Sequence, residues 1–281
     1  MNTELDICKQ CTKREMNFTQ GIVCSLTHEK PVFEDDCAHF EKDESVEERE
    51  QFVKKTYKPK ELKPNTQRAK TAMTLISIVL GLEIVSLVSS GMQYSLLQTL
   101  SQGRPVTNAV AEANDLREQT IAIVYMTVYI ISGITFIRWF RRAYYNLHQK
   151  VTRLSNSEGW AAGSWFVPIV SLYMPYQIMK ELYEETKNYI STHGLKNVLL
   201  ATRFLGLWWA LWIGSNIFGQ VIYHMSKGAA SLTQLANVTI LSIIGSVIGI
   251  VLAIVTIRVI KNYADAEGVL FEQAEMLSIT E

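Results

Sequence analysis

The chain has no cysteine after residue 37, although it is 281 residues long and holds 4 cysteines. Its opening residues are polar and lack the apolar stretch of a secretory signal peptide, so we expect no cleaved leader. The 27 basic and 27 acidic residues give a formal net charge of zero. This balance offers no general attraction to nucleic acid, and we expect no nucleic-acid partner.

Catalytic signatures are also absent from the sequence. It holds no phosphate-binding glycine loop, no Rossmann glycine pattern and no H-E-x-x-H motif. Its 5 histidines include no pair at the four-residue spacing of a helical metal site. We therefore expect no catalytic residues, and a membrane enzyme is the weakest of the function hypotheses.

Long apolar runs, in contrast, are plentiful. Four of them reach the length of about 20 helical residues that a bilayer crossing needs, and they are apolar on nearly all sides, unlike a surface helix of a soluble protein. A fifth segment, 160–178, contains Pro168 and Pro175, which disfavour one continuous helix. We predict an all-α membrane protein with four transmembrane helices plus a proline-broken segment that re-enters or lies at the interface. The four runs are 72–92, 120–140, 204–225 and 236–257.

Basic residues are concentrated on one side of these runs. Lysine and arginine are frequent in 54–70, 138–153 and 180–203, and two more follow the last run. The loops after the first and third runs hold few lysine or arginine residues. The positive-inside rule therefore places both termini in the cytoplasm.

The cysteines form a C-x-x-C pair followed by two single residues. In a reducing cytoplasm they are expected to be thiols, and thiolates at this kind of spacing favour a tetrahedral zinc site that is structural, because four thiolates leave no open position. Such a site would stabilise a segment too short for a large core. Sites that use His28 or His39, thiols without metal, and a redox-active cysteine pair remain alternatives. The predicted ligands are Cys8, Cys11, Cys24 and Cys37.

A few polar residues interrupt the apolar runs. Glu83 lies in the middle of the first run, where an unpaired carboxylate is costly, and three polar residues recur every four positions after Trp212 in the third run. We predict that Glu83 is neutral or pairs with the amides of the third run. These polar residues then have one of two roles. They form a pathway for protons or a ligand, or they form hydrogen bonds that hold the helices together. The predicted polar site is Glu83, Asn216, Gln220 and His224.

Two stretches resemble known bacterial membrane proteins. The first resembles an N-terminal four-cysteine module found on varied membrane proteins, which implies metal binding but no activity. The second, "RWFRRAYYNL" followed by "GWAAGSWFVPIVSLYMPYQIMKELY", resembles the bacterial family called domain of unknown function 4328. This resemblance implies a multi-pass membrane domain over 70–265 and a location in the bacterial inner membrane. The residues that carry the first resemblance are Cys8, Cys11, Arg14, Gly21, Ile22, Cys24, Leu26, Thr27, Pro31, Phe33, Cys37 and Phe40. Those that carry the second are Arg138, Trp139, Arg142, Tyr144, Asn146, Leu147, Gly159, Trp160, Trp165, Phe166, Pro168, Pro175, Tyr176 and Glu181.

These features predict four parts: a zinc module at 1–40, a charged linker at 41–70, a helical membrane domain at 71–262 and a cytoplasmic tail at 263–281. The favoured function is a non-enzymatic scaffold or sensor whose zinc module meets a cytoplasmic protein partner. The alternative is a small-solute or ion transporter that uses the polar residues of the bundle. The lipid bilayer is the expected surrounding, and Gly245 and Gly249 allow close helix packing within the bundle or between copies of a homo-oligomer.

Overall fold

The computed structural model describes residues 7–17, 21–30, 37–45, 62–151, 154–193 and 200–280. The chain divides into two compact units, Met1–Lys60 and Glu61–Glu281. Most of the predicted linker lies outside the described residues, as do Pro31 and Phe33 of the cysteine-module resemblance.

The N-terminal unit contains a small antiparallel sheet. Strand β1 (Arg14–Asn17) pairs with β2 (Gly21–Cys24) in a register that places Arg14 opposite Cys24. Val23 is the buried apolar residue of this hairpin. A separate bridge joins Cys11 to Lys42, so the two ends of the cysteine-containing segment lie close together.

Arg14 ties the same two ends together. Its Nη1 donates to the backbone oxygen of Cys11 at 2.9 Å and lies 2.8 Å from Oδ2 of Asp43. Hydrogen bonds from Ser45 and from this guanidinium hold the pKa of Asp43 below its usual range. The arginine of the cysteine-module resemblance is therefore a structural residue of the unit.

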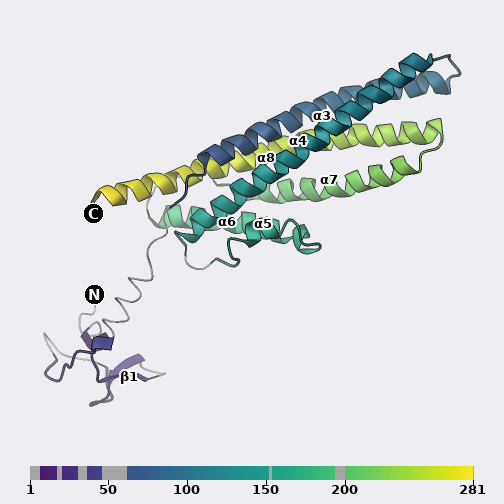
Figure 1. Ribbon diagram of the computed structural model, residues 1–281. Coiled ribbons are helices and arrows are strands. Elements are labelled where there is room, and N and C mark those ends of the chain that lie inside the picture. Colours follow the sequence, from purple (N-terminus) through teal and green to yellow (C-terminus); the bar gives the residue numbers. More distant parts are fainter. Residues whose placement is uncertain are drawn as a thin grey trace. The chain divides into compact units, whose positions relative to one another are not determined.

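Four long helices dominate the second unit (Figure 1). Among the described residues, these four are the helices long and apolar enough to cross a membrane, which confirms the prediction of four spans. Helix α3 packs along both α8 and α4, and α7 packs on α8. The connections 102–107 and 228–231 are short, so each helix pair that they join is an antiparallel hairpin. The helices are α3 (Thr66–Ser101), α4 (Asn108–His148), α7 (Arg203–Lys227) and α8 (Leu232–Thr280).

The helices extend well beyond the apolar runs. Helix α8 has 49 residues and continues through the segment predicted to be a separate tail. Tyr263, Ala266 and Leu270 in that segment are fully buried. No proline or glycine pair interrupts the sequence after the last apolar run, so the helix continues, and its residues 263–270 contribute to the core.

The fifth apolar segment is not one continuous helix, as its prolines predicted. It contains a single turn, α5 (Trp160–Gly163), and a 3₁₀ turn, η1 (Val170–Leu172), before α6 (Met174–Thr192) begins. Ile169, directly after Pro168, has a φ of 66° and a side chain that is 76% exposed. A β-branched residue in this left-handed region is strained, so neighbouring contacts must hold the turn in place.

The core lies where α6 packs against α4, α7 and α8, and residues at the start of α3 join it. Its large side chains are fully buried, and several belong to the family resemblance. Tyr144 donates to Oε2 of Glu181 at 2.6 Å, and Oε1 of Glu181 accepts from the backbone of Ser155 at 2.7 Å. Glu181 thereby holds the turn between α4 and α5. The largest fully buried side chains are Trp139, Trp208, Tyr144, Tyr183, Tyr263, Phe140, Leu147, Ile178, Met179, Leu182, Leu205 and Ile260.

A buried amide network fixes the entry into α3. Asn146 accepts from the backbone of Lys63 at 3.0 Å and donates to the backbone oxygen of the same residue at 2.9 Å. It also lies 2.7 Å from Oε1 of Glu267, whose Oε2 accepts from Asn65 at 2.9 Å. Three parts of the chain, the segment before α3, the end of α4 and the end of α8, therefore meet at Asn146.

Replacing Asn146 with Ala tests this network. We expect the variant to lose about 2–3 kcal/mol of unfolding free energy, because it removes the partner of Oε1 of the buried Glu267 and the partner of the Lys63 backbone amide. Unfolding in mixed detergent micelles measures the change. Asn188→Ala, on the exposed face of α6, is the matched control and is expected to change stability by less than about 0.5 kcal/mol. Equal stability of the two variants would contradict the role given to Asn146.

Candidate functional site

Glu83 is buried in the middle of α3, with 7% of its surface exposed. Tyr125 of α4 donates to its Oε1 at 2.6 Å. Ser246 of α8 lies beside the same carboxyl group. One carboxyl group therefore joins three of the four long helices.

Gly249 of α8 makes room for this carboxyl group. A Cβ atom added at this position would lie 2.6 Å from Cδ of Glu83 and closer still to Oε1. Any side chain larger than glycine would therefore displace Glu83. Gly245, one turn earlier, faces α7 instead, where an added Cβ would lie 3.2 Å from Cδ1 of Ile222. Both glycines of the small-residue pair thus serve packing within the bundle.

A cavity of about 280 Å³ adjoins Glu83 on the side of α5, and we call it the aromatic cavity. Helices α3, α4, α7 and α8 contribute to its walls, and residues 165 and 166 of the broken segment lie against it. Its wall is mostly apolar, and Glu83 carries the one carboxyl group among its described lining residues. The rings that line it are Tyr125, Tyr129, Phe136, Trp165, Phe166, Trp208 and Trp212.

A second cavity, of about 390 Å³, adjoins Glu83 on the side of the α3–α4 turn. We call it the serine cavity, because Ser86, Ser242 and Ser246 line it together with Glu118. Three residues line both cavities: Glu83, Tyr125 and Ser215. The carboxyl group therefore lies at the junction of two hollows in the bundle.

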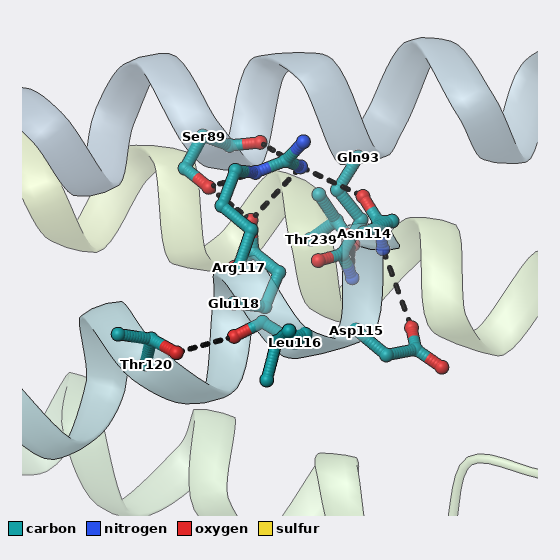
Figure 2. Close-up of polar contacts among 9 residues, drawn as sticks. All are labelled: Ser89, Gln93, Asn114, Asp115, Leu116, Arg117, Glu118, Thr120 and Thr239. Carbon is teal, nitrogen blue, oxygen red and sulfur yellow. Dashed lines mark hydrogen bonds and ion pairs between the residues drawn. The ribbon is translucent and has the colours of Figure 1, made fainter. Parts of the chain in front are cut away.

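Figure 2 shows the polar residues around Glu118, at the far side of the serine cavity. Glu118 accepts from Oγ of Ser89, which in turn accepts from Nε of Arg117 at 2.8 Å. Nη2 of Arg117 also donates to Oδ1 of the buried Asn114 at 2.7 Å. This cluster joins α3 to α4.

Sequence reasoning did not find this cluster. Asn114, Arg117 and Glu118 precede the apolar part of α4 and looked like loop residues. Arg117 and Glu118 follow Asn114 by three and four positions. Residues at this spacing share one face of a helix, and this pattern could have predicted the cluster. A neighbouring bond from Gln93 to Thr239, at 3.2 Å, joins α3 to α8 (Figure 2).

The structure does not bring the other predicted polar residues to Glu83. Asn216, Gln220 and His224 are exposed on α7, and Nδ2 of Asn216 donates within its own helix to the oxygen of Trp212 at 2.7 Å. Ser215 is the α7 residue that shares both cavities with Glu83. A shift of one residue turns the side chain by about 100° around the helix axis, which separates Ser215 from Asn216.

The four cysteines line one cavity of about 380 Å³ in the N-terminal unit. They are thiols, and Cys8 and Cys11 are buried. Burial raises the pKa of Cys8, and the nearby Cys37, Cys11 and Cys24 raise it further, so the four sulfur atoms interact electrostatically. A hydrogen bond from the backbone of Leu26 lowers the pKa of Cys24.

The donor set is chemically suited to zinc, since thiolates are its usual ligands in structural sites. However, no group of three or more cysteine, histidine or acidic residues in the described part of the chain is arranged to hold a metal ion. The cysteines are gathered at one place without a formed coordination shell.

The fold and this buried polar site define a helical integral membrane protein. The family model for Domain of unknown function (DUF4328) matches residues 102–265, more than half of the chain. The chain belongs to this family, as its central motifs predicted. No curated protein and no solved structure matches the chain. The matched range contains Tyr125, Ser246 and Gly249, whereas Glu83 precedes it.

Replacing Gly249 with Ala tests the close approach of α8 to Glu83. The new methyl group must displace the carboxyl group and break its bond to Tyr125, so we expect a loss of about 1–3 kcal/mol in unfolding free energy. Gly81→Ala is the matched control, because an added Cβ there meets no atom within 4 Å. Alanine favours helix over glycine, so the control should be equally or more stable. A neutral Gly249→Ala variant would argue against the contact.

Proposed function

We propose that this protein is a membrane-embedded sensor that binds a small organic cation in the aromatic cavity, with Glu83 as its counter-charge. The observation that carries the proposal is the pairing of one buried carboxyl group with a wall of aromatic rings. It is a non-enzymatic function, in keeping with the lack of catalytic motifs in the sequence.

The chemistry of the cavity favours a cation over other ligands. Faces of tryptophan and tyrosine rings attract quaternary or protonated amines, most strongly where water is excluded. A cation beside Glu83 would offset the cost of burying its carboxylate. The volume of about 280 Å³ is near the lower end for ligand pockets, about 300 Å³, which suits a small ligand.

Binding of benzyltrimethylammonium by the purified full-length protein tests the proposal. Its uncharged carbon isostere, neopentylbenzene, is the matched ligand control. We expect saturable binding of the cation that Glu83→Gln weakens by about tenfold or more, since the variant keeps the shape and loses the charge. Tryptophan fluorescence follows binding, because Trp165, Trp208 and Trp212 line the cavity.

The control variant is Glu184→Gln, which removes a half-exposed acidic residue of α6 that lines neither cavity. It should bind the cation like the wild-type protein. Equal affinity for the cation and its isostere, or unchanged cation binding in Glu83→Gln, would refute the proposal.

Transport is the alternative function, and one observation favours it. The aromatic and serine cavities meet at Glu83, so a solute held there has a hollow on each side. A transporter would move the cation across proteoliposome membranes, and this flux would disappear in Glu83→Gln. Saturable binding without flux supports the sensor.

The N-terminal unit supports a second part of the proposal. We assign it a structural zinc ion held by Cys8, Cys11, Cys24 and Cys37, because all four line the same cavity. When bound, the ion would crosslink the two ends of the unit and stabilise its fold. In the expected orientation both termini lie in the cytoplasm of a bacterial cell, where the zinc unit would meet a protein partner.

The exposed amides of α7 are consistent with a homo-oligomer. Asn216 and Gln220 share one exposed face of a helix that is long and apolar enough to cross a membrane. Amides on such a face form hydrogen bonds between neighbouring helices. A second copy of the chain is the proposed neighbour.

Elemental analysis tests the zinc assignment. The full-length protein, purified without chelators, should carry about one zinc ion per chain. The Cys8→Ser/Cys11→Ser variant should carry none and should expose its remaining thiols to maleimide labelling. His39→Ala is the control and should retain zinc if the four cysteines are the ligands. Metal-free wild-type protein would overturn the assignment.

A further inference from the structure

A pocket of about 300 Å³ lies where α3 begins and α4 leaves its apolar run, and we call it the arginine pocket. It shares no lining residue with the aromatic or serine cavity. Its lining combines basic side chains from two helices and the segment before α3. The lining residues are Lys63, Arg68, Arg138, Arg141, Arg142, Tyr145 and Glu158.

The charges of this pocket are unbalanced. Five of its described lining residues are basic and one, Glu158, is acidic. Glu158 lies 3.5 Å from Nη2 of Arg141. Like charges gathered in one pocket repel each other, and this repulsion is relieved when an anion binds among them.

Local contacts hold several of the cations in position. Nη1 of Arg68 donates to the backbone oxygen of Arg138 at 3.2 Å, which ties α3 to α4. Nζ of Lys63 lies 4.6 Å from the centroid of the Tyr145 ring, and the guanidinium of Arg142 lies 5.9 Å from the same centroid. An anion entering the pocket would therefore meet basic groups that are already arranged.

We propose that the arginine pocket binds a phosphate group. Guanidinium groups form paired hydrogen bonds with phosphate oxygens, and several arginines around one small pocket match the tetrahedral arrangement of those oxygens. The pocket lies next to the end of an apolar run, the depth at which lipid headgroups are found. The phosphate belongs either to an anionic lipid headgroup or to a soluble phosphate.

Three probes distinguish these sources in the full-length, detergent-purified protein. They are dioctanoyl phosphatidylglycerol, the net-neutral dioctanoyl phosphatidylcholine and inorganic phosphate. Thermal unfolding and titration calorimetry measure binding. Saturable binding of the anionic lipid with weak binding of inorganic phosphate identifies a lipid site. Inorganic phosphate that binds as well as the lipid, or displaces it, identifies a soluble phosphate ligand.

Variants connect the binding to this pocket. Arg138→Gln/Arg141→Gln should weaken binding of the preferred anion by about tenfold or more, since each basic residue contributes to the attraction. Lys180→Gln/Lys187→Gln removes the same number of charges from the exposed face of α6 and should leave the affinity unchanged. Glu158→Gln removes the carboxylate from the pocket and should tighten binding by about two- to fivefold.

The Glu158→Gln variant keeps the proposal testable if the double arginine variant does not fold. Unchanged or weaker anion binding in Glu158→Gln would overturn the proposal. The proposal is also overturned if none of the three probes binds saturably, or if the arginine and lysine double variants lose affinity equally.

Discussion

The contact between Glu83 and Gly249 is the constraint on which the interior of the bundle depends. A carboxyl group in the middle of a bilayer-crossing helix needs polar partners and a place away from lipid. Gly249 leaves room for the carboxyl group, because no side chain separates it from the backbone of α8. Tyr125 and Ser246 supply the partners. The distance between α3 and α8, and the junction of the two cavities, follow from this one close approach.

The residues of the family resemblance serve mainly to build the fold. Tyr144 and Glu181 hold the turn before α5, and Asn146 joins the segment before α3 to the end of α8. These buried hydrogen bonds join segments that are far apart in the sequence, although Oδ1 of Asn65 and Nε1 of Trp139 are buried without a hydrogen-bond partner among the described residues. The aromatic cavity uses different residues, apart from the rings of Trp165 and Phe166 at its wall, whereas Arg138 and Arg142 of the resemblance line the arginine pocket.

The two ends of the bundle differ in chemistry. Near the α3–α4 turn, Arg117 and Glu118 form a balanced cluster with Ser89 and Asn114. At the other end, the arginine pocket holds basic groups in excess. The balanced cluster satisfies its own charges and joins two helices, whereas the unbalanced pocket needs an anion from outside. This difference suits a protein with one end at an anionic membrane surface.

The sequence by itself determined the four spans, the break in the fifth segment, the family and the isolated position of the cysteines. Each of these depends on local properties: the length of an apolar run, the missing amide hydrogen of Pro168 and Pro175, or the spacing of a motif. Glu83 also stood out, because a carboxyl group within an apolar run is unusual on its own.

Only the tertiary structure decided which residues meet Glu83. The four-residue spacing of Asn216, Gln220 and His224 correctly places them along one side of α7 but says nothing of which side faces α3. Rotation about the helix axis and the register between helices depend on the packing of all four helices together. The partners Tyr125, Ser246 and Gly249, and the pocket formed by arginines from α3 and α4, therefore emerge only when those helices are assembled.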